Sequence, residues 1–202
     1  MQVFKEEQAI DRLAELGLTE QILERVVRRA DAEARLCSDF DPPLLEGLTR
    51  WGRATRYLRE ELVPLGWSFD NPRNFARTIH PSREFAIVVT TGDELTGVPG
   101  ATPGTKYPKG LATMLAVTAN VQLAFDFGSE FLLNGAGIVT WFLMIHSDDR
   151  EHRVELSLPG GFADGTITHW AERIILTPFV RADPLLIGDE ASEVVVEVAH
   201  RR

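Results

Sequence analysis

Residues 138–158 read IVTWFLMIHSDDREHRVELSL, a pattern that predicts two adjacent strands. Its first part, Ile138–His146, is a nearly continuous apolar run, which is typical of a central strand buried on both faces. Its last part, Arg153–Leu158, alternates apolar and polar residues with the period of a half-exposed strand. Because only the polar residues 147–152 separate the two runs, we expect them to form an antiparallel hairpin.

Further strands are predicted on both sides of this hairpin. Phe85–Thr91 is rich in β-branched residues and ends at Gly92. Ile174–Thr177 and Val194–Val198 have the same character. We expect the second strand of the hairpin to end at residues 159–161, which read Pro-Gly-Gly.

The first third of the chain has helical periodicity instead. Residues 9–16 carry apolar side chains at helical spacing and precede Gly17, a natural residue for a helix end. Thr19 is placed to cap a second helix, and Asp41 is placed to cap a third that begins with Pro42 and Pro43. The third helix has one clean apolar stripe, made of Leu44, Leu48, Trp51, Thr55, Leu58, Leu62 and Leu65.

Helices first and strands later favour an α+β fold over a repeated β-α-β pattern. We expect an N-terminal helical layer of about three helices in residues 1–67. A mainly antiparallel sheet is expected in residues 68–202, and the two parts should form one compact unit. Between the strands, residues 113–123 fit a short helix, and a strand over 117–127 is the competing interpretation.

The composition argues against several classes of protein, namely nucleic-acid-binding, disulfide-stabilised and membrane proteins. The chain has 202 residues and a net charge of −9, so the whole molecule should repel nucleic acid and anionic membranes. Its single cysteine, Cys37, permits no intrachain disulfide, which suits the reducing cytoplasm. No signal peptide or apolar run of membrane-spanning length is present, and we therefore expect a cytoplasmic protein.

The segment 92–110 is the predicted functional loop. It contains five Gly and three Pro in nineteen residues, and a loop of this length in a compact domain is usually functional or disordered. We expect Asp93 and Glu94 to order the loop by pairing with Lys106 and Lys109, and the two lysines to contact a partner. The full set of predicted partner-binding residues is Gly92, Asp93, Glu94, Thr96, Gly97, Thr105, Lys106, Lys109 and Gly110.

The spacing of the residues does not favour a catalytic site. The Gly-rich part of the loop lacks the Gly-Lys pair and the following helix of a phosphate-binding P-loop. A metal site in the turn, formed by His146, Asp148, Asp149 and His152, has suitable ligand types, although polar residues are expected in any such turn. A metal-dependent nuclease centre with Asp93, Glu94 and the lysines needs geometry that the spacing does not provide.

A nucleic-acid-binding surface was a further alternative. Arg50, Arg53, Arg56 and Arg59 recur every three residues on the third predicted helix. They wind around the helix, and pairing with neighbouring glutamates is the ordinary interpretation of such a pattern. Acidic residues in the last third of the chain could instead give the sheet a negative face that binds a basic partner.

Two blocks of the sequence together resemble a known group of bacterial proteins. The first is Gly92-Asp-Glu-x-Thr-Gly with Thr105-Lys-x-Pro-Lys-Gly110 and Asn120, and the second is Glu155-Leu-Ser-Leu-Pro with Trp170-Ala-Glu-Arg-Ile-Ile-Leu. The chain resembles, over roughly residues 65–179, a group of uncharacterised proteins carried by plasmids, integrative elements and phages. This resemblance implies a role in mobile-element cargo, such as an anti-CRISPR-type antagonist of host defence.

The sequence therefore predicts a non-enzymatic binding protein that contacts a host protein or nucleoprotein complex. We assign no catalytic residue, metal or cofactor, and we expect no direct binding to nucleic acid or membrane. The alternative is a metal-dependent enzyme that acts on a phosphate-bearing or nucleic-acid substrate. The sequence leaves the oligomeric state open.

Overall fold

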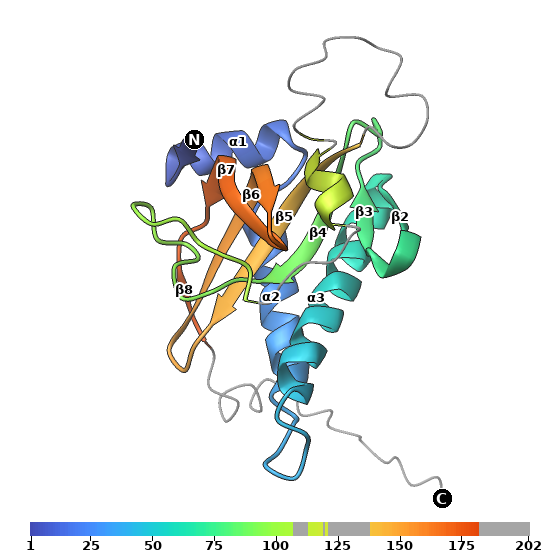
Figure 1. Ribbon diagram of the computed structural model, residues 1–202. Coiled ribbons are helices and arrows are strands. Elements are labelled where there is room, and N and C mark those ends of the chain that lie inside the picture. Colours follow the sequence, from blue (N-terminus) through green and yellow to red (C-terminus); the bar gives the residue numbers. More distant parts are fainter. Residues whose placement is uncertain (107–112, 119, 121–137, 182–202) are drawn as a thin grey trace, which may run out of the picture.

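The computed structural model describes residues 1–106, 113–118, 120 and 138–181. These residues form an α+β fold in which helices lie against one face of a mostly antiparallel sheet (Figure 1). The predicted fold class is confirmed at this level. No described helix is both long and apolar enough to cross a membrane.

The described sheet has eight strands. Along its main path the order is β1-β7-β6-β5-β4-β3-β2, and β8 pairs with the beginning of β6. Two pairings are parallel, β1 with β7 and β4 with β5, and the others are antiparallel. The strands are β1 (Gln2–Phe4), β2 (Ser68–Asp70), β3 (Arg77–Ile79), β4 (Phe85–Thr91), β5 (Val139–Ser147), β6 (Glu151–Ala163), β7 (Thr166–Ile175) and β8 (Phe179–Val180).

Three α-helices precede most of the sheet, as predicted: α1 (Glu7–Glu15), α2 (Glu20–Ala34) and α3 (Leu45–Leu62). The Thr19 hydroxyl caps α2 by accepting the Ile22 amide at 3.2 Å. Gly17 has a φ of +68°, the left-handed conformation expected after a helix. The predicted Asp41 cap of α3 is wrong, because that carboxylate accepts the Ser38 amide and α3 begins only at Leu45.

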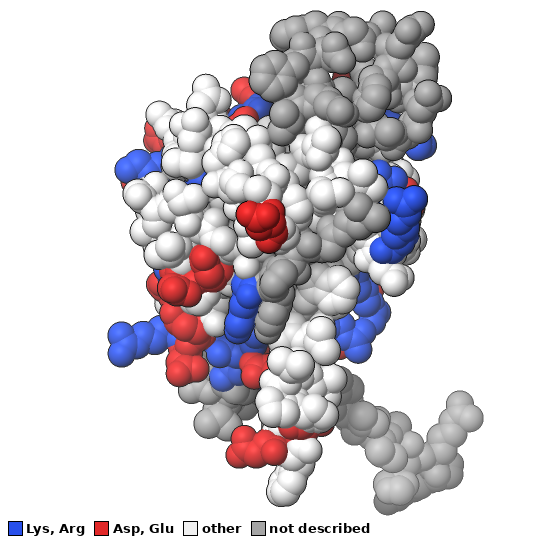
Figure 2. Space-filling view, in the orientation of Figure 1, with Lys and Arg blue, Asp and Glu red and all other residues white. Residues whose placement is uncertain are grey.

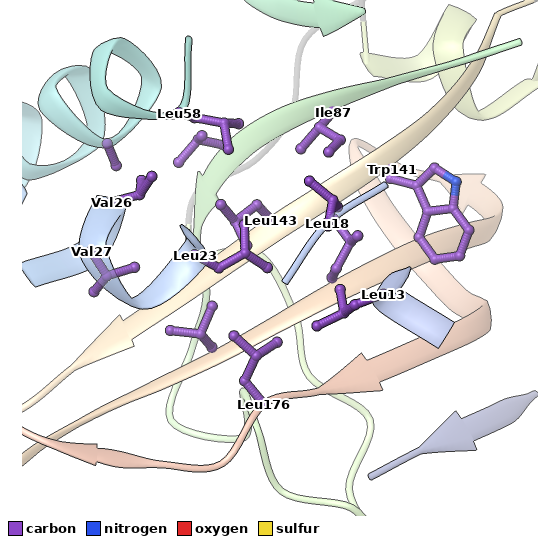
Figure 3. Packing of buried hydrophobic residues seen from close by; sticks show 14 of the residues in the cluster. Leu13, Leu18, Leu23, Val26, Val27, Leu58, Ile87, Trp141, Leu143 and Leu176 are labelled. Atoms are coloured by element: carbon purple, nitrogen blue, oxygen red, sulfur yellow. The ribbon is translucent and has the colours of Figure 1, made fainter. Parts of the chain in front are cut away.

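The largest hydrophobic core lies between the helices and one face of the sheet. Figure 3 shows Leu23 and Val26 of α2 and Leu58 of α3 facing Ile87 of β4 and Leu143 of β5. All five of these side chains are fully buried. Burying a side chain of this size stabilises the fold by about 1.5–3 kcal/mol, so this core holds the two layers together.

The opposite face of the sheet is covered as well. Phe142 and Met144 of β5 pack there with Trp170 of β7 and Val117. Residues 113–118 and 120 are helical, which favours the helix over the strand among the two interpretations of this segment. Because both faces of β5 are covered, its nearly continuous apolar sequence is explained.

The strands differ from expectation at several points. The hairpin of β5 and β6 is antiparallel, as predicted, but β4 and β5 are parallel. β6 does not end at residues 159–161; it continues to Ala163, and shifts in register absorb the Pro-Gly-Gly sequence. The strand predicted at 194–198 lies outside the described residues. β1, β2, β3 and β8 have two or three residues each, too few to show a period.

Candidate functional site

The loop that begins at Gly92 is closed at its base by backbone hydrogen bonds. Gly92 and Thr105 form an antiparallel bridge. The Asp93 amide donates to the Gly104 carbonyl at 3.1 Å, and the Lys106 amide donates to the Thr91 carbonyl at 3.0 Å. We refer to residues 92–106 as the loop. Its two ends are therefore joined by a short ladder of backbone hydrogen bonds.

The Asp93 side chain ties the arms together. Its Oδ1 accepts the Leu95 amide at 3.0 Å, and its Oδ2 accepts the Gly104 amide at 2.6 Å. We predicted that Asp93 and Glu94 would order the loop by pairing with Lys106 and Lys109, and this pairing stays a prediction. Asp93 orders the loop through the two backbone amides, and the Glu94 carbonyl accepts Arg153 Nη1 at 2.7 Å.

A buried ion pair lies beneath the loop. Glu155 of β6 and Arg173 of β7 have fully buried side chains, and Arg173 Nε donates to Glu155 Oε1 at 3.1 Å. Ser157 Oγ donates to the same carboxylate oxygen at 2.7 Å. A buried charge is costly unless it is paired and hydrogen-bonded, and here both charges are.

The ion pair also binds the loop backbone directly. Glu155 Oε2 accepts the Gly97 amide at 2.9 Å, and Arg173 Nη1 donates to the Ala101 carbonyl at 2.6 Å and to the Val98 carbonyl at 3.3 Å. Nearby, Trp170 Nε1 donates to the Pro103 carbonyl at 2.8 Å. Three side chains of the sheet thus satisfy one loop amide and three loop carbonyls, which fixes the loop against the face opposite the helices.

Gly97 is required at its position for two reasons. Its φ is +76°, which strains any residue with a side chain, and a Cβ there would lie 2.9 Å from Arg153 Cβ. The loop backbone at Gly97 therefore packs directly against Arg153 of β6, with no space for a side chain between them. The part that faces solvent is the remainder of the loop, and its exposed residues are Glu94, Leu95, Pro99, Gly100, Thr102 and Lys106.

The predicted site residues divide accordingly. Gly92, Thr96 and Gly97 are buried and shape the loop, whereas Glu94 and Lys106 are exposed; Asp93 and Thr105 are intermediate. Lys109 and Gly110 lie outside the described residues.

Sequence reasoning missed Glu155, Trp170 and Arg173 as anchors, because a period-two strand was expected to have a solvent face. Their one signal was indirect, since the two sequence blocks of the resemblance contain them and pack together here.

A second group of charges joins the helices to the sheet. The Asp31 carboxylate of α2, only 3% exposed, accepts Arg50 Nε and Arg181 Nε, each at 2.9 Å. Burial opposes its ionisation, but the hydrogen bond from Arg181 and the charges of both arginines lower the pKa of Asp31. This cluster fastens β8 and α3 to α2.

His152 completes this cluster on the sheet side. Its Nε2 lies 3.7 Å from Asp31 Oδ2, and its Nδ1 lies 2.7 Å from Ser147 Oγ. Burial lowers the pKa of His152 to about 4, with the positive charges of Arg181 and Arg50 adding to the effect and Asp31 opposing it. The imidazole is therefore neutral at pH 7.

The alternative of a metal site in the β5–β6 turn is not supported by the arrangement of its residues. His146 lies opposite Arg153 in the ladder and Ser147 lies opposite His152, so the two histidines are on different faces of the sheet. Asp148 instead caps the turn by accepting the amides of Arg150 and Glu151. Among the described residues, no group of three or more His, Cys, Asp or Glu side chains could hold a metal ion.

The arginines of α3 pair with neighbouring side chains, which is the ordinary interpretation of their spacing. Each one has a partner: Arg50 with Asp31, Arg53 with Glu33, Arg56 with Glu60, and Arg59 with Asn71. The idea of an acidic sheet face is also weakened, because Glu155 is buried and Glu172 pairs with Arg12. On the face seen in Figure 2, the described acidic and basic side chains are interspersed.

Comparison of the chain with protein-family models, curated proteins and solved structures finds no match.

Proposed function

We propose that this protein is a non-enzymatic binding protein whose loop is a preformed contact surface for another protein. The observation that carries the proposal is the anchoring of the loop by the buried Glu155–Arg173 pair. Ordering a flexible loop on binding costs free energy, and a loop that is already ordered avoids most of that cost. A fold that buries two charges in order to fix an exposed loop is suited to recognition.

The chemistry of the exposed loop residues fits a protein partner. Leu95 and Pro99 offer apolar contacts, while Glu94 and Lys106 offer one charge of each sign. An interface with an apolar centre and a polar rim is the ordinary arrangement between proteins. The mixed charge also argues against a surface for phosphate chains, which need a concentration of positive charge.

The partner class in this proposal is a host protein or nucleoprotein complex. This part rests on the resemblance to mobile-element cargo, in which small acidic proteins antagonise host defence, as anti-CRISPR proteins do. The loop would then occupy a surface that the host complex needs for its own activity.

Affinity capture from a bacterial lysate, with and without nuclease treatment, tests the proposal. We expect a stoichiometric protein that remains bound after nuclease treatment. A Leu95→Asp, Lys106→Glu variant should lose at least roughly tenfold in affinity for it, because interface energy is concentrated in few residues. The matched control is Ile10→Asp, which changes an exposed apolar residue of α1, 52% exposed, away from the loop.

Two outcomes would overturn the proposal. One is a captured partner that binds the loop variant and the control equally well. The other is the absence of a partner together with a phosphate-ester hydrolysis activity that depends on a divalent metal, which would support the enzyme alternative instead.

A further inference from the structure

The apolar stripe of α3 continues past the part of the helix that the sheet covers. Leu58 and Leu62 are fully buried, but Trp51 is 41% exposed, Leu48 58% and Leu44 64%. The spacing of these residues places all five on one face of the helix. Trp51 Nε1 donates to the Val89 carbonyl of β4, and the turns of α3 that precede Trp51 extend beyond that strand (Figure 1).

We call Leu44, Leu48 and Trp51 the overhanging face. An apolar helix face of this kind is normally covered, because burial of each large side chain contributes about 1.5–3 kcal/mol. Two further apolar side chains, Leu36 and Phe40 in the connection before α3, are 83% and 100% exposed. The sequence thus supplies apolar side chains for an interface that the described residues do not complete.

A cavity of about 90 Å³ lies between α3, where Trp51 of the overhanging face lines it, and the carboxyl ends of β4 and β5. Its lining combines a Trp and two aliphatic residues with the cationic side chains of Arg50 and Lys106. The residues that line it are Gly47, Arg50, Trp51, Val89, Thr90, Thr91, Gly92, Lys106, Ile145, His146 and Ser147. An occupant with apolar side chains matches Trp51, Val89 and Ile145 in this lining.

The described part of the chain ends at Arg181, whose side chain contacts the first turn of α3. Arg181 Nη2 lies 3.4 Å from Glu46 Oε1, and Glu46 is in the first turn of α3, between Leu44 and Leu48 in sequence. Residues 182–202 follow, beginning Ala-Asp-Pro-Leu-Leu-Ile-Gly-Asp-Glu. The apolar run 184–187 starts three residues after Arg181 and has Asp183 and Asp189 on its two sides.

The distances allow the contact. Five residues of extended chain, from Arg181 to Leu186, span up to about 17 Å. The rise of α3 from Glu46 to Trp51 is only about 7.5 Å. The run is therefore within reach of the whole overhanging face.

We propose that residues 184–187 bind the overhanging face of α3 within the same molecule, with Leu185, Leu186 and Ile187 as the apolar contacts. This inference is independent of the proposed function, because it concerns a different surface.

Disulfide trapping in the full chain tests the proposal. In a Cys37→Ser background, Leu48→Cys is combined with Leu186→Cys and the rate of disulfide formation is measured. The matched control adds Leu185→Asp and Ile187→Asp, which keep the tether length and remove the apolar contacts. We expect roughly tenfold slower disulfide formation in the control, because tethering alone supplies only the effective concentration of a flexible linker.

Equal rates in the two proteins would overturn the proposal, as would a disulfide-linked dimer whose yield rises with protein concentration. The dimer would show that a second copy covers the face. If the cysteine variants do not fold, amide exchange of residues 44–51 decides instead. Leu185→Asp with Ile187→Asp should then speed that exchange relative to the unmodified chain, and an unchanged rate would contradict the proposal.

Discussion

Different kinds of interaction hold the covering segments to the two faces of the sheet. Toward the helices, apolar side chains from three helices and four strands interlock, with Leu23, Leu58 and Leu143 fully buried. Toward the loop, a smaller apolar cluster is joined by the Glu155–Arg173 pair and by hydrogen bonds to loop backbone. Apolar packing holds layers together without direction, whereas charged hydrogen bonds fix one backbone path. The second face therefore presents a defined surface, and the first provides stability.

Removing one partner of the buried pair should produce the largest effect. Arg173→Met leaves the Glu155 carboxylate buried without its countercharge, and we expect a loss of about 3–5 kcal/mol in the free energy of unfolding. Urea denaturation followed by circular dichroism measures it. The double variant Arg173→Met, Glu155→Leu is the control and should recover only the part of the loss that comes from the unpaired Glu155 charge, because the loop amide and carbonyls lose their partners in both variants. A single variant as stable as the unmodified protein would show that the pair does not hold the loop face.

The helix face should respond through cavity formation instead. Leu143→Ala is expected to cost about 2–5 kcal/mol, because Leu143 is fully buried between the layers. The comparison predicts that the loop keeps its structure in this variant, as seen in the exchange of the Gly97 amide. If Leu143→Ala frees the loop as much as Arg173→Met does, the two faces are not independent.

The difference between the two faces explains which parts of the fold could be predicted from the sequence. The helices and β4, β5 and most of β6 were predictable because their side chains repeat with the period of their secondary structure, as in Phe85–Thr91. Glu155 and Arg173 were not, since a charged residue in an alternating strand normally faces water. These side chains are buried because the loop covers this face of the sheet. The loop residue that binds Glu155 is Gly97, which lies 58 residues earlier in the sequence. The parallel pairing of β4 with β5 was missed for a related reason, because pairing depends on a distant partner.

The candidate site was predictable in its position but not in its mechanism. Five glycines and three prolines marked residues 92–110 as a special loop. Which of its residues face inward could not be predicted, since Thr96 and Glu94 are both polar and only the former is buried. Similarly, His146 and His152 were grouped by their closeness in the chain, and the alternation of a strand separated them.

The helix face of the sheet also has a buried group of charged residues, the cluster at Asp31, which lies at its edge. The pKa of His152 is lowered from 6.5 in the unfolded chain to about 4. The unfolded chain therefore binds more protons between these values, and stability is full above pH 6.5 and falls as the pH drops toward 4. We expect a loss of about 3 kcal/mol across this window.

Denaturation at a series of pH values checks this expectation. His152→Asn should flatten the pH dependence between 6.5 and 4 while leaving the steeper loss at lower pH, where Asp31 is protonated. An unchanged slope in the variant would mean that another group is responsible.

A smaller effect is expected where the loop touches β6. Gly97→Ala forces a side chain into the left-handed conformation and to within 2.9 Å of Arg153 Cβ. We expect a loss of about 1–3 kcal/mol in stability. Gly100→Ala is the matched control, since a Cβ there has open space around it. Equal stability of the two variants would contradict the close packing of the loop on β6.

Amide hydrogen exchange in the free protein determines whether the loop is ordered before any partner binds. The Gly97 amide donates to Glu155 and the Gly104 amide donates to Asp93. We expect both amides to exchange far more slowly than amides in open coil, with Gly97 approaching the protection of the β5 amides. Exchange of both amides at the rate of an unstructured peptide would show that the loop is not ordered in the free protein.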